Sequence, residues 1–103
     1  MRESVRNIEK YGREYADAKA LSWLLQEQRK VVLATQMAKS EGKSINAKEL
    51  DALQSEEYKN HLDGTKEAIA EEHRLKATSE RWYAQFEACR SMMSFTKKQM
   101  EIL

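Results

Sequence analysis

Cationic side chains occur near both ends of the sequence, where they could bind phosphate. Clustered lysine and arginine neutralise phosphate groups as point charges, without reading bases. The six candidates for nucleic-acid contact are Arg6, Lys10, Arg13, Arg90, Lys97 and Lys98. Acidic residues are interleaved with them, so the alternative interpretation is ordinary charge pairing on exposed helix faces, as between Lys10 and Glu14.

The other reactive residue types are not spaced as in a metal site or a catalytic site. His61 and His73 stand twelve residues apart, without the Glu-x-x-His or His-x-x-x-His spacing of metal sites in helices. Cys89 follows Trp82 by seven residues on an apolar stripe, which favours core packing over a nucleophile. Gly-rich phosphate loops and Ser-His-Asp sets are missing from the sequence. We therefore expect a non-enzymatic protein with no catalytic residue, metal, cofactor or small-molecule substrate.

The composition predicts an all-α fold in a single domain covering residues 1–103. The sequence has no proline and only three glycines, and it is rich in the strongest helix formers. Hydrophobic residues make up 41% and charged residues 34%. This balance is typical of long helices that share a narrow seam, as in an antiparallel hairpin with coiled-coil or bundle-like packing.

A first long helix is predicted for residues 3–39. Apolar residues recur there at three- and four-residue steps. They are Val5, Ile8, Tyr11, Tyr15, Ala18, Leu21, Leu25 and Val32. The polar cluster around Gly42 then predicts a turn.

A short helix is predicted for residues 47–53 within the connection. Asn46 and Glu49 have the spacing of a capping box, in which each side chain satisfies a free backbone N–H. Leu50 and Leu53 are expected to pin this helix to the end of the hairpin.

A second long helix is predicted for residues 55–101. Ser55 offers a capping hydroxyl, and Glu56 and Glu57 stand where the helix dipole favours acidic groups. Gly64 leaves open a kink or a later start at Asp63, because glycine weakens a helix interior by about 1 kcal/mol.

The two stripes predict a seam inside the hairpin or between subunits. The seam residues are Tyr11, Tyr15, Leu25, Val32, Ile69, Leu75, Trp82, Phe86 and Met93. A two-helix hairpin leaves much apolar surface uncovered, so we expect a homo-oligomer, either a dimer or larger. One cysteine, a charged start over Met1 to Lys10 and the lack of a long apolar run predict a cytoplasmic protein without membrane contact.

Charge is divided unevenly along the chain. Residues 41–72 carry nine Asp or Glu against four Lys or Arg, whereas residues 73–103 carry six Lys or Arg against three acidic residues. The hairpin end is therefore predicted to be acidic and the opposite end basic.

Three short stretches resemble a loose group of small phage and prophage proteins. They are Tyr-Lys-x-His-Leu at 58–62, Lys-Glu-Ala at 66–68 and Phe-Glu-Ala-Cys-Arg-Ser at 86–91. Cys89 stands where the group often has tryptophan. Some proteins of this group are similar to products encoded near recombination or replication genes. The resemblance therefore implies a nucleic-acid-related accessory role.

Two functional hypotheses follow. The first is a non-enzymatic, oligomeric phage or prophage accessory protein that binds DNA or a recombination or replication protein. The second is a structural scaffold or a regulatory protein-protein interaction module without nucleic-acid contact, in which the acidic residues 41–72 matter most.

Overall fold

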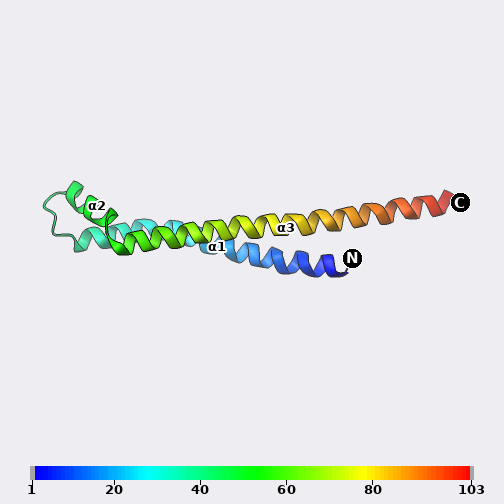
Figure 1. The fold of residues 1–103 in the computed structure, drawn as a ribbon, viewed down its shortest axis with the longest axis horizontal. Helices are drawn as coiled ribbons and strands as arrows, with labels where there is room; N and C mark the ends of the chain where they lie inside the picture. The colour runs from blue at the N-terminus through cyan, green and yellow to red at the C-terminus, as the bar shows by residue number, and fades with distance from the viewer. Residues whose placement is uncertain (1, 103) are drawn as a thin grey trace. The chain divides into compact units, whose positions relative to one another are not determined.

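The computed structural model describes residues 2–102, with the side chains of residues 2–101, and three helices account for almost all of them. They are α1 (Arg2–Lys39), α2 (Ile45–Leu53) and α3 (Glu56–Ile102). The all-α hairpin of two long helices joined through a short one is confirmed (Figure 1). No strand occurs within residues 2–102.

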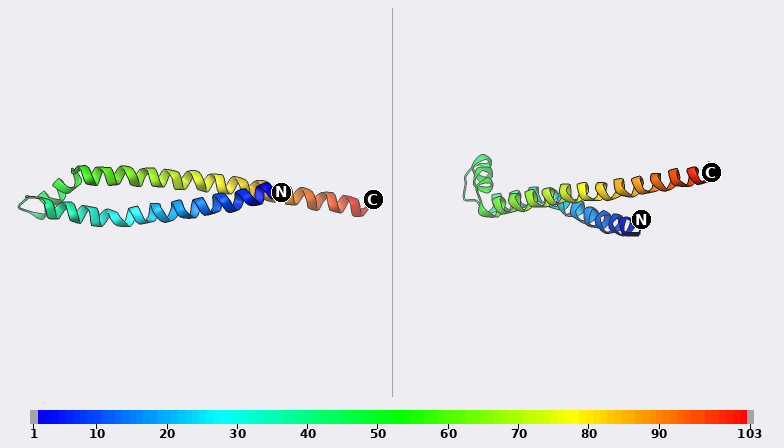
Figure 2. Two further views of the ribbon diagram at one scale, coloured as in Figure 1. Left: turned by 90° about the horizontal axis from the view of Figure 1, so that it is seen from below. Right: turned by 45° about the vertical axis from the view of Figure 1, so that its right-hand side comes forward.

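The chain divides into two units, to which α1 and α3 both contribute. Unit 1 comprises Met1–Asp17 and His73–Leu103, and unit 2 comprises Ala18–Glu72. In each unit the stretch of α1 runs antiparallel to the stretch of α3 (Figures 1 and 2). Each unit has a narrow core rather than a thick one. Leu75 and Ser4 are buried in unit 1, and Tyr58, Ala68 and Ser22 are buried in unit 2.

Neither long helix is interrupted at its glycine. The helical range of α1 includes Gly12, and that of α3 includes Gly64. The later start of the second helix at Asp63, which the sequence left open, is therefore excluded.

Ser55 caps α3 in the way its position predicts. Its Oγ accepts a hydrogen bond from the Tyr58 N–H at 3.2 Å and donates one to the Ala52 carbonyl at 2.7 Å. Glu56 and Glu57 occupy the first turn, where the partial positive charge of the helix start favours carboxylates. A single hydroxyl therefore joins the end of α2 to the start of α3.

Replacing Ser55 with alanine is expected to lower the free energy of unfolding by about 1 kcal/mol, because a free N–H at the start of α3 loses its acceptor. Urea denaturation followed by circular dichroism measures this loss. Ser55→Asp keeps an acceptor at the same place and should recover most of the stability. Equal losses in both variants would show that the cap contributes little.

The prediction that α2 begins with an Asn46 capping box is wrong. The N-cap is Ser44, whose Oγ accepts from the Ala47 N–H at 3.1 Å. Ser44 has extended backbone angles, which aim its hydroxyl at the first free N–H groups. The helix therefore begins at Ile45 rather than at residue 47, and Asn46 lies inside it.

The prediction that Leu50 and Leu53 pin α2 to the hairpin is also wrong. Leu50 is 56% exposed and Leu53 is 41% exposed, whereas Ala52 is buried. Ala52 is the residue of α2 that is buried, in place of the leucines. Asp51, about opposite Leu53 on the helix, accepts a hydrogen bond from the Ser40 hydroxyl at 2.6 Å.

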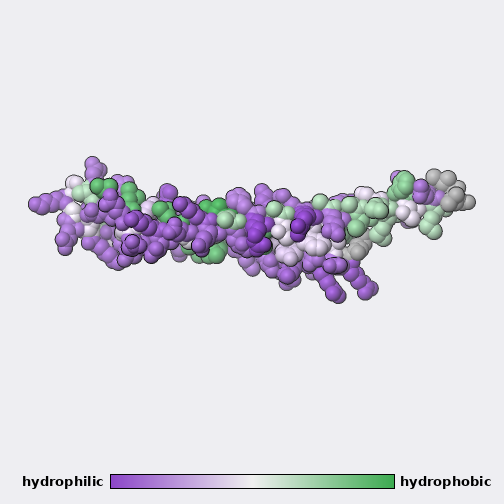
Figure 3. Space-filling view, in the orientation of Figure 1, coloured by the Kyte–Doolittle hydropathy of each residue, from purple (hydrophilic) through white to green (hydrophobic). Residues whose placement is uncertain are grey.

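Ile45, Leu50 and Leu53 form an exposed apolar surface that we call the α2 face. Figure 3 shows hydrophobic atoms in the part of the molecule where Figure 1 draws α2. Large aliphatic side chains gathered on one short helix are typical of a surface that another molecule covers.

Candidate functional site

The seam of unit 1 is built around two aromatic rings. Tyr11 of α1 and Trp82 of α3 stack with their centroids 6.4 Å apart and their planes 6° from parallel. The indole Nε1 of Trp82 is buried and has no hydrogen-bond partner within the described residues. Leu75 continues the same side of α3 and is 4% exposed. This end of the molecule is therefore held by aromatic and aliphatic packing.

The other predicted seam residues are only partly covered. Those that are half-buried in the chain are Tyr15, Leu25, Val32, Ile69 and Phe86. Met93, in contrast, is exposed.

Two serines that the sequence stripe missed lie on the seam of α1. Ser4 and Ser22 are buried, whereas Val5 and Leu21, which were assigned to the stripe, are exposed. The expected places of Val5 and Leu21 on the seam are therefore wrong. At both places a serine one residue away from the apolar side chain is buried instead. Ser22 accepts a hydrogen bond from Gln26 Nε2 at 3.0 Å, which satisfies its buried oxygen.

His61 joins the two long helices within unit 2. Its Nε2 lies 2.8 Å from the carbonyl oxygen of Leu25, a contact between α3 and α1. Because a carbonyl only accepts, Nε2 carries the hydrogen and donates it. Among residues 2–101, no three His, Cys, Asp or Glu side chains gather where they could hold a metal ion.

The last turns of α3 extend beyond α1. The Tyr11–Trp82 stack sets the antiparallel register of unit 1. Counting back from Tyr11 to Arg2, and forward by the same number of residues from Trp82, places Ser91 level with the start of α1. Residues 92–101, which we call the α3 overhang, therefore have no facing stretch of α1 within the described chain (Figure 2). At 1.5 Å per residue the overhang is about 15 Å long.

The α3 overhang exposes large apolar side chains. Met93 and Met100 follow Phe86 at heptad steps, so they continue the helix side that packs on α1 further back. Met93 is 59% exposed and Met100 is 71% exposed. A shallow groove runs along this side. Its lining residues are Met92, Met93, Thr96, Lys97 and Met100.

All six candidate cations are exposed and belong to unit 1. Several already make contacts on their own helix. Arg90 pairs with Glu87 at 3.2 Å, and Lys10 Nζ lies 5.2 Å from the centroid of the Tyr11 ring. Arg13 Nε donates to the Glu9 carbonyl at 3.4 Å. The Arg90–Glu87 contact is a charge pair of the kind that the alternative interpretation expects.

The cations do not form one patch. Arg13 lies two residues from Tyr11 and from Tyr15, so it points to roughly the opposite side of α1 from those seam side chains. Arg6 precedes Arg13 by a heptad and shares that outer side. Arg90, Lys97 and Lys98 belong to α3, which lies on the seam side of α1. The predicted cluster is therefore divided between two surfaces.

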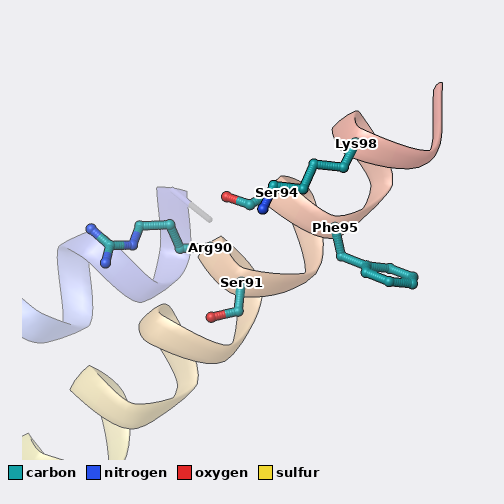
Figure 4. Close-up of a pocket in the computed structure, with 5 residues that line it drawn as sticks. All are labelled: Arg90, Ser91, Ser94, Phe95 and Lys98. Carbon is teal, nitrogen blue, oxygen red and sulfur yellow. The ribbon is translucent and has the colours of Figure 1, made fainter. Parts of the chain in front are cut away.

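A hollow on α3 brings two of the cations together with hydroxyl groups. It is lined by Arg90, Ser91, Ser94, Phe95 and Lys98. Figure 4 shows the Phe95 ring pointing away from Arg90, Ser94 and Lys98. Cations and hydroxyls could bind an anion here, but the ring is not placed to stack a base beside them.

Comparison of the chain with known proteins finds no match. Neither a protein-family model, nor a curated protein, nor a solved structure matches it. The site is therefore interpreted from its geometry. None of the described helices is both long enough and apolar enough to cross a membrane.

Proposed function

We propose that the chain is a non-enzymatic, self-associating helical protein that acts by binding other proteins, as an assembly scaffold or a regulatory module. One observation carries this proposal. The α3 overhang exposes Met92, Met93, Phe95 and Met100 within three turns of helix. Contiguous apolar surface of this kind marks protein interaction sites, because leaving it in water is unfavourable.

The narrowness of the core supports the same conclusion. The buried apolar side chains in the described part are Ala52, Tyr58, Ala68 and Leu75, and three of these four belong to unit 2. Small domains with little core commonly gain stability by oligomerising. Association with further copies would add the buried surface that the single chain lacks.

Sedimentation velocity and light scattering, from low micromolar to several hundred micromolar protein, test the proposal. We expect the mean molar mass to rise with concentration while the helical signal per residue stays constant or increases. A chain that remains monomeric over the whole range would overturn self-association.

Nucleic-acid contact is the second candidate function, and a specific observation favours it. Between Glu87 and Glu101, α3 carries Arg90, Lys97 and Lys98 and no acidic residue. This stretch is uniformly basic, although the chain as a whole has a net charge of only +1. The phage or prophage setting and the role beside recombination or replication proteins stay predictions of the sequence resemblance.

Fluorescence anisotropy of labelled single- and double-stranded oligonucleotides tests this second function. If three phosphates are neutralised, duplex affinity should fall by about 40-fold between roughly 50 and 200 mM salt. Replacing Arg90, Lys97 and Lys98 with glutamine should abolish this binding, while Arg6→Gln/Arg13→Gln on the outer side of α1 leaves it largely intact. An absence of binding at low salt would exclude direct nucleic-acid contact.

A further inference from the structure

Two exposed apolar surfaces of the chain are complementary in length, apolarity and charge. The α2 face carries three large aliphatic side chains on a helix of nine residues. The groove of the α3 overhang carries three methionines over a similar length. Methionine is unbranched and adaptable, so a groove lined by it can close around leucine side chains.

The charges beside the two surfaces have opposite signs. Glu49 lies on α2 beside Leu50 and Leu53, and Glu56 and Glu57 follow at the start of α3, all three exposed. Lys97 lines the methionine groove. Opposite charges around an apolar contact steer association and fix its orientation.

We propose that the α2 face of one copy docks in the methionine groove on the α3 overhang of a second copy, with Glu49 facing Lys97. The inference rests on the proposed self-association and names its surfaces. The contact is heterologous, because the two copies contribute different surfaces. After this contact the first copy keeps its groove free and the second keeps its α2 face free, so each end of the pair can bind a further copy.

Pairing of two overhangs with each other is the main competing arrangement. It would bring Lys97 of one copy near Lys97 of the other, where like charges repel. The α2 face avoids this repulsion, because the charge beside its leucines is the carboxylate of Glu49.

Two matched variants separate these arrangements by sedimentation velocity. Met93→Gln/Met100→Gln removes the groove and leaves the α2 face, while Leu50→Gln/Leu53→Gln does the reverse. All four positions are exposed, so the helical content should stay that of the wild type. Leu21→Gln/Val31→Gln, which changes two exposed apolar residues of α1, serves as the matched control.

Each groove or α2 variant alone is expected to be monomeric under conditions where the wild type and the control associate. An equimolar mixture of the two should form a discrete dimer and stop there, because it contains one intact pair of surfaces. Dimerisation of the Leu50→Gln/Leu53→Gln chain by itself would overturn the inference in favour of paired overhangs. Association of both variants as in the wild type would overturn it while leaving self-association standing. A monomeric wild type would overturn both.

Charge reversal tests the orientation of the contact. Glu49→Lys and Lys97→Glu should each weaken association by about two- to five-fold, and the chain carrying both should recover it. A double variant weaker than either single one would overturn the Glu49–Lys97 pairing.

Discussion

Leu75→Ala is expected to destabilise unit 1 by about 3 kcal/mol. Leu75 is the one large aliphatic side chain that is buried within the described part of this unit, and removing a buried leucine loses its burial and leaves a cavity. A loss of this size is a large share of the total stability of a small domain. The free energy of unfolding, from urea denaturation at a concentration where the chain is monomeric, measures it.

Leu21→Ala is the matched control, because it makes the same chemical change at a side chain that is 51% exposed. It should cost less than about 1 kcal/mol, since little apolar surface leaves the interior. Similar losses in the two variants would contradict the packing of unit 1 described above.

Trp82→Ala and Trp82→Phe are expected to differ widely in their loss of stability. Alanine removes the ring that stacks on Tyr11, and because Trp82 is only half-buried the loss should be about 2–3 kcal/mol. Phenylalanine keeps an aromatic ring at the seam and removes the Nε1–H, which has no hydrogen-bond partner among the side chains and backbone that the structure describes. Since a buried unpaired donor is unfavourable, the phenylalanine variant should lose at most about 1 kcal/mol.

Urea denaturation followed by circular dichroism separates these cases, because both variants remove the tryptophan of the unit 1 seam and leave only Trp23 to report by fluorescence. The Tyr11→Leu chain is a useful companion, since it keeps apolar volume opposite Trp82 but removes the stack. A phenylalanine variant as unstable as the alanine one would mean that the indole N–H is required at the seam.

The sequence predicts the helices well because their signals are local. Helix-forming composition, heptad steps and the Ser55 cap all act within a few residues, and they give α1 and α3 to within two residues at each end. The seam was less predictable. Ser4 and Ser22 fit the unbroken steps of three and four residues along α1. The prediction chose Val5 and Leu21, each one residue away, because they are more hydrophobic.

The orientation of α2 could not be predicted from hydrophobicity. Two leucines on a short helix indicate an inward side, yet Ala52 is the buried residue, and Asp51 is hydrogen-bonded to Ser40. This contact joins residues eleven apart across a loop, and no local pattern reports it. The division of the cations, by contrast, could be predicted from the sequence. The spacing of Arg13 from Tyr11 and Tyr15 already implies that Arg13 lies on a different side of α1 from the two tyrosines.

Two pairs that join α1 to α3, one hydrogen-bonded and one stacked, also differ in how much chain they enclose. Leu25 and His61 are 36 residues apart, while Tyr11 and Trp82 close a loop of about twice that length. Closing a longer loop has the greater entropic cost, so the hairpin should form first beside its turn and zip outward. Hydrogen exchange should therefore be fastest at the free helix ends of unit 1 and slowest beside Tyr58 and Ala68.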